Sequence, residues 1–277
     1  MTHHFIGAGV GLRQAHLPAL LERDDHQPPV LELTPSHFFT GFTGFAGFAE
    51  LELERVAEGR TIVLHDVLAS LGTAAHLDRA HLDRVAAVAK RCAAIAYTEH
   101  LAMTRSPGGL DLGHLIPLRR TPAQLELLID HVHAVQDRLA LPVALELPTT
   151  TLELDHQLRE AEFVAALVER SGCELVLDLE NLRVDAHNFP ALPVSERLAR
   201  LPLAAVSHVH LAGGHPVGEW VIDSHAEPVP DATFALLAQL RGRMNPRTII
   251  VERDDRLPAL TELLGEARRA AAIWRGE

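Results

Sequence analysis

Residues 206–225, VSHVHLAGGHPVGEWVIDSH, combine a short buried strand with a group of side chains that can bind metal ions. Val206 to Leu211 is apolar and β-branched, and Ala212-Gly213-Gly214 breaks it where a strand would run into a loop. Side chains alternate across a strand, so His208 and His210 share one face. Taken alone, surface histidines or hydrogen-bonded core histidines explain the stretch equally well. The potential metal donors in this stretch are His210, His215, Asp223 and His225.

The same pattern, an apolar run closed by His, Asp or Glu, recurs along the chain. Leu175-Val176-Leu177-Asp178 and Ile249-Ile250-Val251-Glu252 are two examples. One such residue at a strand end is ordinary, but solubility does not readily explain seven in one register. The closing residues of the seven runs are Glu32, His65, Glu99-His100, Glu146, Asp178, His210 and Glu252.

Composition limits the class of protein. A chain of 277 residues with 47% hydrophobic content suits one large α/β domain, expected over residues 1–277. The formal charge of -12 and the lack of a Lys/Arg cluster argue against a nucleic-acid partner. Cys92 and Cys173 lie in apolar settings typical of reduced, buried thiols. With no signal-peptide pattern and no run of eighteen apolar residues, we expect a cytoplasmic protein without a membrane partner.

Strand and helix patterns alternate along the whole chain. Strands are expected at 5–12, 30–33, 62–65, 94–99, 143–146, 175–178, 206–211 and 248–252. Helices are expected at 13–22, 50–58, 76–92, 122–139, 160–171, 196–201, 231–243 and 257–274. Eight such units predict a single-domain TIM (β/α)8 barrel better than a doubly wound sheet. Because the chemistry of such barrels lies at the C-terminal strand ends, the closing residues are predicted to meet at one rim.

Three other features have simpler interpretations. Gly7, Gly9 and Gly11 have the wrong third spacing for a dinucleotide fingerprint and indicate close backbone approach instead. The phenylalanine- and glycine-rich segment 38–48 is interpreted as a loop folded onto the barrel rim, or as a lid or peptide-contact surface. His131 and His133, in the helix expected at 122–139, are interpreted as surface histidines.

The predicted rim is suited to several metal ions. Imidazoles and carboxylates without a thiolate form a borderline-hard donor set that fits iron, manganese or zinc. On separate strands, Glu146, Asp178 and Glu252 would repel one another unless cations lay between them. A bridging carboxylate with two or three metal ions meets that requirement. Asn181, three residues after Asp178, is close enough to bind a metal or to orient a ligand.

A set of motifs, in order along nearly the whole chain, resembles the multinuclear iron-dependent oxidases. This family was formerly catalogued as domain of unknown function 692 and includes the methanobactin-making oxidase. The HLAG and ID-x-H blocks are the most specific parts of the resemblance. The motifs are GVGLR at 9–13, His65, Glu99-His100-Leu101, Leu-Glu-x-Pro at 145–148, LDLEN at 177–181, VHLAGGH at 209–215, IDSHAEPV at 222–229 and VERDD at 251–255.

The resemblance implies a TIM barrel that holds two or three iron ions, as Fe(II) and Fe(III). Such an enzyme acts with O2 on a ribosomally made peptide, commonly at cysteine. It usually works beside a partner protein that recognises the leader of the peptide. The metal ligands that the resemblance implies are His65, His100, Glu146, Asp178, His210, Asp223, His225 and Glu252, with Asn181 as a further one.

Two departures from the family pattern bear on the substrate and the outcome of the oxidation. Leu147 stands where many relatives have asparagine, and Ser36-His37 stands where relatives often have Glu-Asn. Both leave the implied ligands intact.

Five further residues are expected to contact the ligands or the substrate. Arg13 and Arg253 are interpreted either as structural ion-pair partners or as groups that orient a peptide carbonyl or carboxylate. Glu32 and His215 are candidates for the surroundings of the ligands. His208 is a third candidate, or equally a hydrogen-bonded residue deeper in the barrel.

Two other classes of function remain open from the residues. A metal-dependent hydrolase or isomerase acting on a sugar or phosphoester is the alternative enzyme, because trinuclear His/Asp/Glu sites on barrels support that chemistry too. A binding protein in which the metal only stabilises the barrel is the third class, and the number of donors argues against it.

Overall fold

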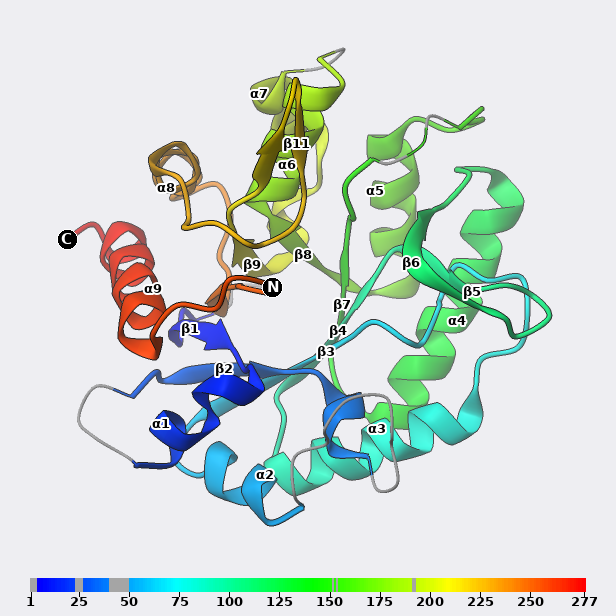
Figure 1. Ribbon diagram of the computed structural model, residues 1–277. Helices are drawn as coiled ribbons and strands as arrows, with labels where there is room; N and C mark the ends of the chain where they lie inside the picture. Colours follow the sequence, from blue (N-terminus) through cyan, green and yellow to red (C-terminus); the bar gives the residue numbers. More distant parts are fainter. Residues whose placement is uncertain (1–3, 23–26, 40–49, 151, 153, 191–192) are drawn as a thin grey trace.

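The computed structural model describes residues 4–22, 27–39, 50–150, 152, 154–190 and 193–277. In this part of the chain, eight parallel strands close into a barrel that is surrounded by helices (Figure 1). The prediction of a single-domain TIM barrel is therefore confirmed. Around the barrel, in hydrogen-bonded order, the strands are β1 (Gly7–Gly11), β12 (Thr248–Val251), β9 (Val206–Leu211), β8 (Glu174–Asp178), β7 (Val143–Glu146), β4 (Ala96–His100), β3 (Thr61–Asp66) and β2 (Val30–Leu33).

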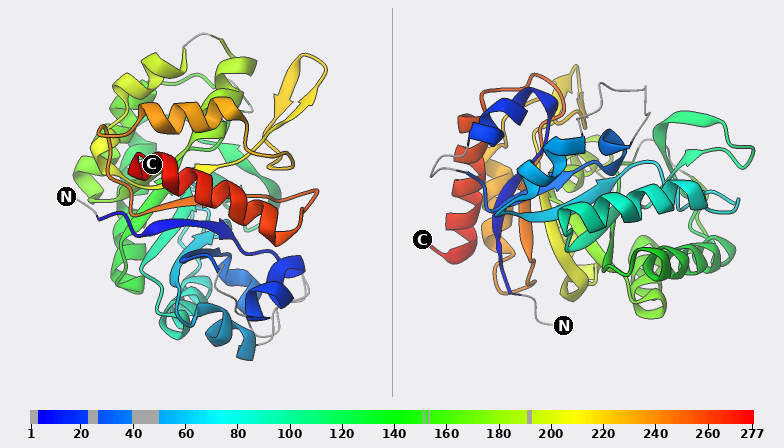
Figure 2. Two further views of the ribbon diagram at one scale, coloured as in Figure 1. Left: turned by 90° about the vertical axis from the view of Figure 1, so that its left-hand side faces the viewer. Right: turned by 90° about the horizontal axis from the view of Figure 1, so that it is seen from below.

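The helices form the outer layer (Figures 1 and 2). They are α1 (Leu17–Glu22), α2 (Glu50–Ala57), α3 (Arg79–Cys92), α4 (Pro122–Leu139), α5 (Glu160–Ser171), α6 (Leu179–Asn188), α7 (Val194–Arg200), α8 (Asp231–Gln239) and α9 (Leu260–Arg275). The start of α4 follows the expected local chemistry. Thr121 caps it by accepting a hydrogen bond from the backbone of Gln124, and Pro122 stands in its first turn.

Apart from shifts of up to four residues at helix ends, the helix pattern differs from the prediction in two places. The segment predicted as one helix at 13–22 begins with a 3-10 turn, Gln14–His16, before α1. Helix α6 was not predicted, because it follows β8 without a loop. Asp178 ends the strand and also caps the helix, since its Oδ1 accepts a hydrogen bond of 2.7 Å from the backbone of Asn181.

Two antiparallel hairpins extend from loops of the barrel. The first pairs β5 (Ala102–Arg105) with β6 (Asp111–Pro117), and residues 106–110 form the turn between them. The second pairs β10 (His215–Val217) with β11 (Trp220–Ile222) and projects from the body of the molecule (Figure 2). The hairpins follow β4 and β9 respectively, and therefore both lie at the C-terminal rim.

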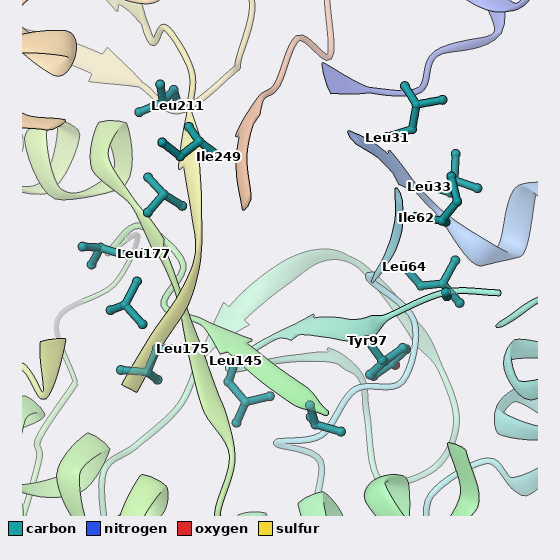
Figure 3. Packing of buried hydrophobic residues seen from close by; sticks show 14 of the residues in the cluster. Leu31, Leu33, Ile62, Leu64, Tyr97, Leu145, Leu175, Leu177, Leu211 and Ile249 are labelled. Carbon is teal, nitrogen blue, oxygen red and sulfur yellow. The ribbon is translucent and has the colours of Figure 1, made fainter. Parts of the chain in front are cut away.

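Apolar side chains on the outer face of the barrel strands pack beneath the helices. Figure 3 shows members of this large buried cluster, among them Leu31, Leu64, Tyr97 and Leu177, around the ring of strands. Phe38 and Phe39 belong to the same cluster, so the start of the phenylalanine-rich segment packs against the apolar core around the barrel. The rest of that segment, residues 40–49, lies outside the described residues.

The inward-facing residues form a separate small layer. Val30, Val63, Ala96 and Ile250 make an apolar cluster of their own across the barrel. Because side chains alternate along a strand, the residues two positions further on face inward as well. Those positions bring polar groups into the barrel above the apolar layer, and they are Glu32, His65, Thr98 and Glu252.

Buried polar and sulfur groups elsewhere test two sequence interpretations. Cys92 and Cys173 are buried free thiols, as predicted. His131 is not a surface residue as predicted: it is buried, and its Nδ1 lies 2.8 Å from the carbonyl oxygen of Leu71. Helix α4 packs this face against the loop after β3, which the helical periodicity alone did not reveal. His133 is exposed, in agreement with the prediction.

Gly9 makes the closest backbone contact that the sequence predicted. A Cβ atom at Gly9 would lie 1.9 Å from the carbonyl oxygen of Val30, on the neighbouring strand β2. That oxygen cannot move away without opening the barrel. A methyl group at Gly265 in α9, by contrast, would meet no heavy atom within 4 Å.

We expect Gly9→Ala to lower the free energy of unfolding by at least about 2 kcal/mol, because the added methyl overpacks a rigid backbone contact. Gly265→Ala is the matched control, and it should be neutral or stabilising by up to about 1 kcal/mol, since alanine favours helix. Urea denaturation of both variants measures the difference. Equal stability of the two would contradict the close approach at Gly9.

Candidate metal centre

The side chains that close the apolar runs converge inside the C-terminal end of the barrel. Within the described residues, seven of them and His225 form four overlapping groups of three, and the potential ligand atoms of each group lie within 4.8 Å of one another. These side chains are all buried or nearly so. The groups are Glu32-His65-His210, His65-His100-Glu146, Glu146-Asp178-His210 and Asp178-His225-Glu252.

Glu146, at the end of β7, lies between three imidazoles. Its Oε2 is 3.8 Å from Nε2 of His65, 3.8 Å from Nε2 of His100 and 3.2 Å from Nδ1 of His210. Its Oε1 accepts a hydrogen bond of 3.2 Å from Nδ2 of Asn181. One carboxylate thus belongs to two of the groups.

His65 is held in place by a hydroxyl on the neighbouring strand. Its Nδ1 lies 2.8 Å from Oγ1 of Thr98, and the same hydroxyl donates to the carbonyl oxygen of Leu64 at 3.2 Å. Because that hydroxyl proton is used, Thr98 accepts a hydrogen bond from Nδ1 of His65. The lone pair of the imidazole is therefore on Nε2, which faces Glu146.

Glu32 lies closer to the centre than the sequence analysis implied. It was expected to be part of the surroundings, but its Oε2 is 3.0 Å from Nε2 of His210, and it shares a group with His65 and His210. The other nitrogen of His210, Nδ1, lies 3.1 Å from Oε2 of Glu252. His210 is completely buried and has carboxylates on both sides.

His225 lies at the edge of the centre in an unusual backbone conformation. Its φ of 49° is rare for a residue other than glycine and costs on the order of 1–3 kcal/mol. A hydrogen bond of 3.0 Å from the backbone of Asp254 to its carbonyl oxygen holds it there. Nε2 lies 2.9 Å from Oδ1 of Asp223, and Nδ1 lies 3.1 Å from Oδ2 of Asp254. Arg13 in turn pairs with Asp254.

The remaining predicted residues lie further from the groups. His208 is one layer deeper in the barrel, with Nδ1 2.7 Å from Oγ1 of Thr248, as its interpretation as a hydrogen-bonded barrel residue expected. His215 is at the rim and pairs with Glu227 at 2.8 Å. Arg253 is buried and pairs with Glu266 at 3.3 Å, on the side of α9. Arg13 alone of the two arginines lines the cavity described below.

Thr98 and Asp254 also lie at the centre, and neither was predicted from the sequence as a site residue. Thr98 precedes His100 by two residues, so strand alternation places both on the inner face. Asp254 is part of the VERDD motif, which was noted only as a pattern. Alternation was therefore a usable signal for Thr98, whereas the role of Asp254 depends on how the loop after β12 turns.

Several buried polar atoms of the centre converge without pairing. They are buried, yet they make no hydrogen bond of acceptable geometry with any described residue. Lone pairs that point to a shared space rather than at a partner are costly unless a cation fills the space. The residues therefore fit a metal ion. The atoms are Oε2 of Glu146, Oδ2 of Asp178, Oδ1 of Asn181, Nδ1 of His210, Oδ1 of Asp223 and both ring nitrogens of His225.

The pKa shifts of the metal-free protein also indicate that the centre requires positive charge. Burial disfavours a charged imidazole, but Glu146 and Glu99 outweigh it and raise the pKa of His100 to about 9. Burial likewise opposes charge on Glu146, yet the imidazoles of His210 and His100 lower its pKa to about 2. Burial raises the pKa of Asp178 well above its usual range, because Glu146 and Asp223 add to it and outweigh His225.

A cavity of about 1030 Å³ opens above the centre. Its floor includes His65, His100, Glu146 and Glu252. Both rim hairpins contribute to its walls, with Leu115 from β6 and Trp220 from β11 among the lining residues. The donor groups are thus accessible to a molecule much larger than water.

None of the helices in the described part of the chain is long and apolar enough to span a membrane.

The closed barrel with polar donors at its C-terminal rim defines a TIM-barrel protein whose donor groups could hold metal ions. Solved TIM-barrel enzymes share this fold. A D-psicose 3-epimerase with D-fructose has a TM-score of 0.56 at 12% identity, covering 100% of this chain and 99% of its own. Endonuclease IV from Thermus thermophilus has a TM-score of 0.57 at 15% identity, covering 98% and 99%.

Sequence comparison then defines the family. Residues 7–275 match the family described as "RiPP precursor modification enzyme MbnB/TglH/ChrH", where a RiPP is a ribosomally synthesised and post-translationally modified peptide. The chain belongs to this family, as its motifs predicted. It is 32% identical to a UPF0276 protein of Caulobacter vibrioides, over 98% of this chain and 95% of the relative. It is 34% identical to one of Chromobacterium violaceum, over 97% and 95%.

We expect the stability of the metal-free protein to fall as the pH rises from about 6.5 to 9. His100 has an ordinary pKa of 6.5 that the fold raises to about 9, so its stabilising proton is present below 6.5 and is lost as the pH passes through 9. His210 and His225, whose pKa values are also raised, act in the same direction. The measurement is the thermal midpoint at both pH values after chelation. A His100→Gln variant should show a smaller fall, and a midpoint that rises over this interval would contradict the assignment.

Proposed function

We propose that the protein binds two or three iron ions at this centre and uses O2 to modify a ribosomally synthesised peptide, at a cysteine. The observation that carries the proposal is the set of buried donor atoms that converge without hydrogen-bond partners beneath an open cavity. Membership of the family supports a peptide as the substrate. Iron at the centre, as Fe(II) and Fe(III), would pass electrons from the peptide to O2, which is reduced, and would lower the pKa of a substrate thiol.

The proposed ligands are those that the sequence implied, together with Glu32. Their donor chemistry supports the assignment, because imidazoles and carboxylates suit iron, and both cysteines are buried outside the cavity lining. Asn181 and Asp223 each aim an unpaired buried oxygen, which supports a place for them in the set. The proposed ligands are Glu32, His65, His100, Glu146, Asp178, Asn181, His210, Asp223, His225 and Glu252.

The protein's own groups would orient the ligands and the substrate. Glu146 would bridge two ions, since it belongs to two donor groups. Oδ2 of Asp254 lies 3.1 Å from Nδ1 of His225, and Arg13 pairs with Asp254 in turn. We further propose a partner protein that recognises the peptide leader, and action in the cytoplasm, where Cys92 and Cys173 would stay reduced.

Anaerobic purification followed by metal analysis and exposure to O2 tests the proposal. We expect more than one equivalent of iron and an O2-dependent change in visible absorbance. Stoichiometric zinc without a redox response would instead favour the hydrolase or isomerase. Metal without any turnover of peptide would favour a structural role.

His210→Ala and Asp178→Ala should lower bound iron and activity together, because each removes a donor shared by two groups. His133→Ala is the control, since this histidine is exposed on α4 and should leave iron unchanged. Iron content in purified variants is measured by elemental analysis. Full iron content in both variants would remove His210 and Asp178 from the ligand set.

Thr98→Val should weaken metal binding about 10–100-fold while the fold persists, because it removes the hydroxyl that orients His65 and keeps the side-chain shape. Competition with a chelator measures the affinity. Thr98→Ser keeps the hydroxyl and should recover most of it. If valine and serine bind metal equally well, the hydroxyl does not orient His65.

A further inference from the structure

The hairpin β10–β11 places an apolar surface on the wall of the cavity. Trp220, Val221 and Ile222 all line the cavity, and the side chains of Trp220 and Ile222 are 52% and 49% exposed. Phe189, at the end of α6, lines the same cavity, and its ring meets that of Trp220 in an edge contact with centroids 5.9 Å apart. Large side chains left half exposed at the mouth of a site mark a place where an apolar group binds.

This wall is fixed before any ligand arrives. The backbone N–H of Val221 donates to Oδ1 of Asn188 at 2.9 Å, and Nδ2 of Asn188 donates to the carbonyl oxygen of Val221 at 2.7 Å. On its other face the hairpin packs against Gly214, where a Cβ atom would lie 2.8 Å from Cγ1 of Val221. Trp220 is therefore exposed on a hairpin that is held in place by hydrogen bonds to Asn188 and by packing against Gly214.

The same contacts determine how a peptide is recognised here. Asn188 occupies both backbone groups of Val221, so a substrate strand cannot extend the hairpin through that residue. Recognition at this wall must use side chains. The strand β6 contributes Asp111, His114 and Leu115 to the lining, and the charged donors line the same cavity. The cavity lining thus contains an apolar part at Trp220 and charged parts elsewhere.

We propose that Trp220, Phe189 and Ile222 form a subsite for an apolar side chain of the peptide, next to the residue that is modified. This rests on the proposed function only in taking a peptide as the substrate. The wall is continuous with the cavity above the donors, so an occupant of the wall is a neighbour of whatever group enters the centre. An extended peptide meets both regions, because adjacent side chains of an extended chain point to opposite sides.

Binding of two synthetic peptides to the purified protein tests the subsite. Ac-Leu-Cys-Leu-NH2 should bind at least about tenfold more tightly than Ac-Ser-Cys-Ser-NH2 by calorimetry, which corresponds to about 1.4 kcal/mol. The chain has two tryptophans, so Trp274→Phe leaves Trp220 as the fluorescent reporter. The apolar peptide should change its emission. Equal affinity for the two peptides, or fluorescence emission of Trp220 that changes with neither peptide, would overturn the proposal.

Variants separate the subsite from the metal chemistry. Trp220→Ala and Ile222→Ser should each weaken binding of the leucine peptide several-fold with metal content unchanged. Val217→Ala is the matched control, because Val217 is on the same hairpin, is 53% exposed and is not among the cavity-lining residues. If Trp220→Ala and Val217→Ala bind alike, the subsite is wrong.

The serine analogue Ac-Leu-Ser-Leu-NH2 tests the role of cysteine independently. If it binds as well as the cysteine peptide and still depends on Trp220, the subsite is supported while the proposed attack at cysteine loses its support. If it binds more weakly than the cysteine peptide and still depends on Trp220, both proposals are supported.

Discussion

The concentration of buried carboxylates in the end of a closed barrel is the constraint on which the rest of the structure depends. The side chains of Glu32, Glu146, Asp178 and Glu252 are buried close together, so their repulsion is strong and must be offset by positive charge. In the bare protein the imidazoles provide it, which is why the pKa values of His100, His210 and His225 are raised. The negative potential of the carboxylates favours protonation of these imidazole rings, and the same potential would attract metal cations.

The barrel tolerates this concentration of charge because different residues of each strand stabilise the fold and carry the donor groups. Outward side chains such as Leu64 and Tyr97 pack under the helices, and an apolar layer containing Val63 closes the interior below the donors. The donor groups occupy the last inward positions, and His208 and Thr248 form a hydrogen-bonded polar pair one layer below them. The strand ends are therefore polar at a small cost to the core, and Gly9 lets β1 approach β2 closely enough to complete the ring.

Residues around the donors orient the donor side chains and determine which molecules the cavity can bind. Thr98 fixes the tautomer of His65, and Asp254 with Arg13 orients His225 in its left-handed conformation. Above them the cavity is divided, since the floor is charged and the wall at Trp220 is apolar and braced by Asn188. A peptide suits such a cavity because its neighbouring side chains differ in polarity. The departure at Leu147 does not leave the loop unsupported, because Asn181 still donates to the carbonyl oxygen of that residue.

The sequence by itself determined the barrel, because each strand carries its own apolar run and each run ends in a donor such as His65, Glu146 or Glu252 at the same register. Local hydrophobic periodicity is sufficient to predict the barrel. The sequence motifs were sufficient to predict the family. Tertiary structure alone decided which donors share a metal-sized space: Glu32 reaches His210 across the barrel, whereas His215 turns out to the rim. It also decided the burial of His131 and the α6 helix that Asp178 starts. These outcomes depend on closure of the ring and on loop paths, which bring together residues that no local pattern connects.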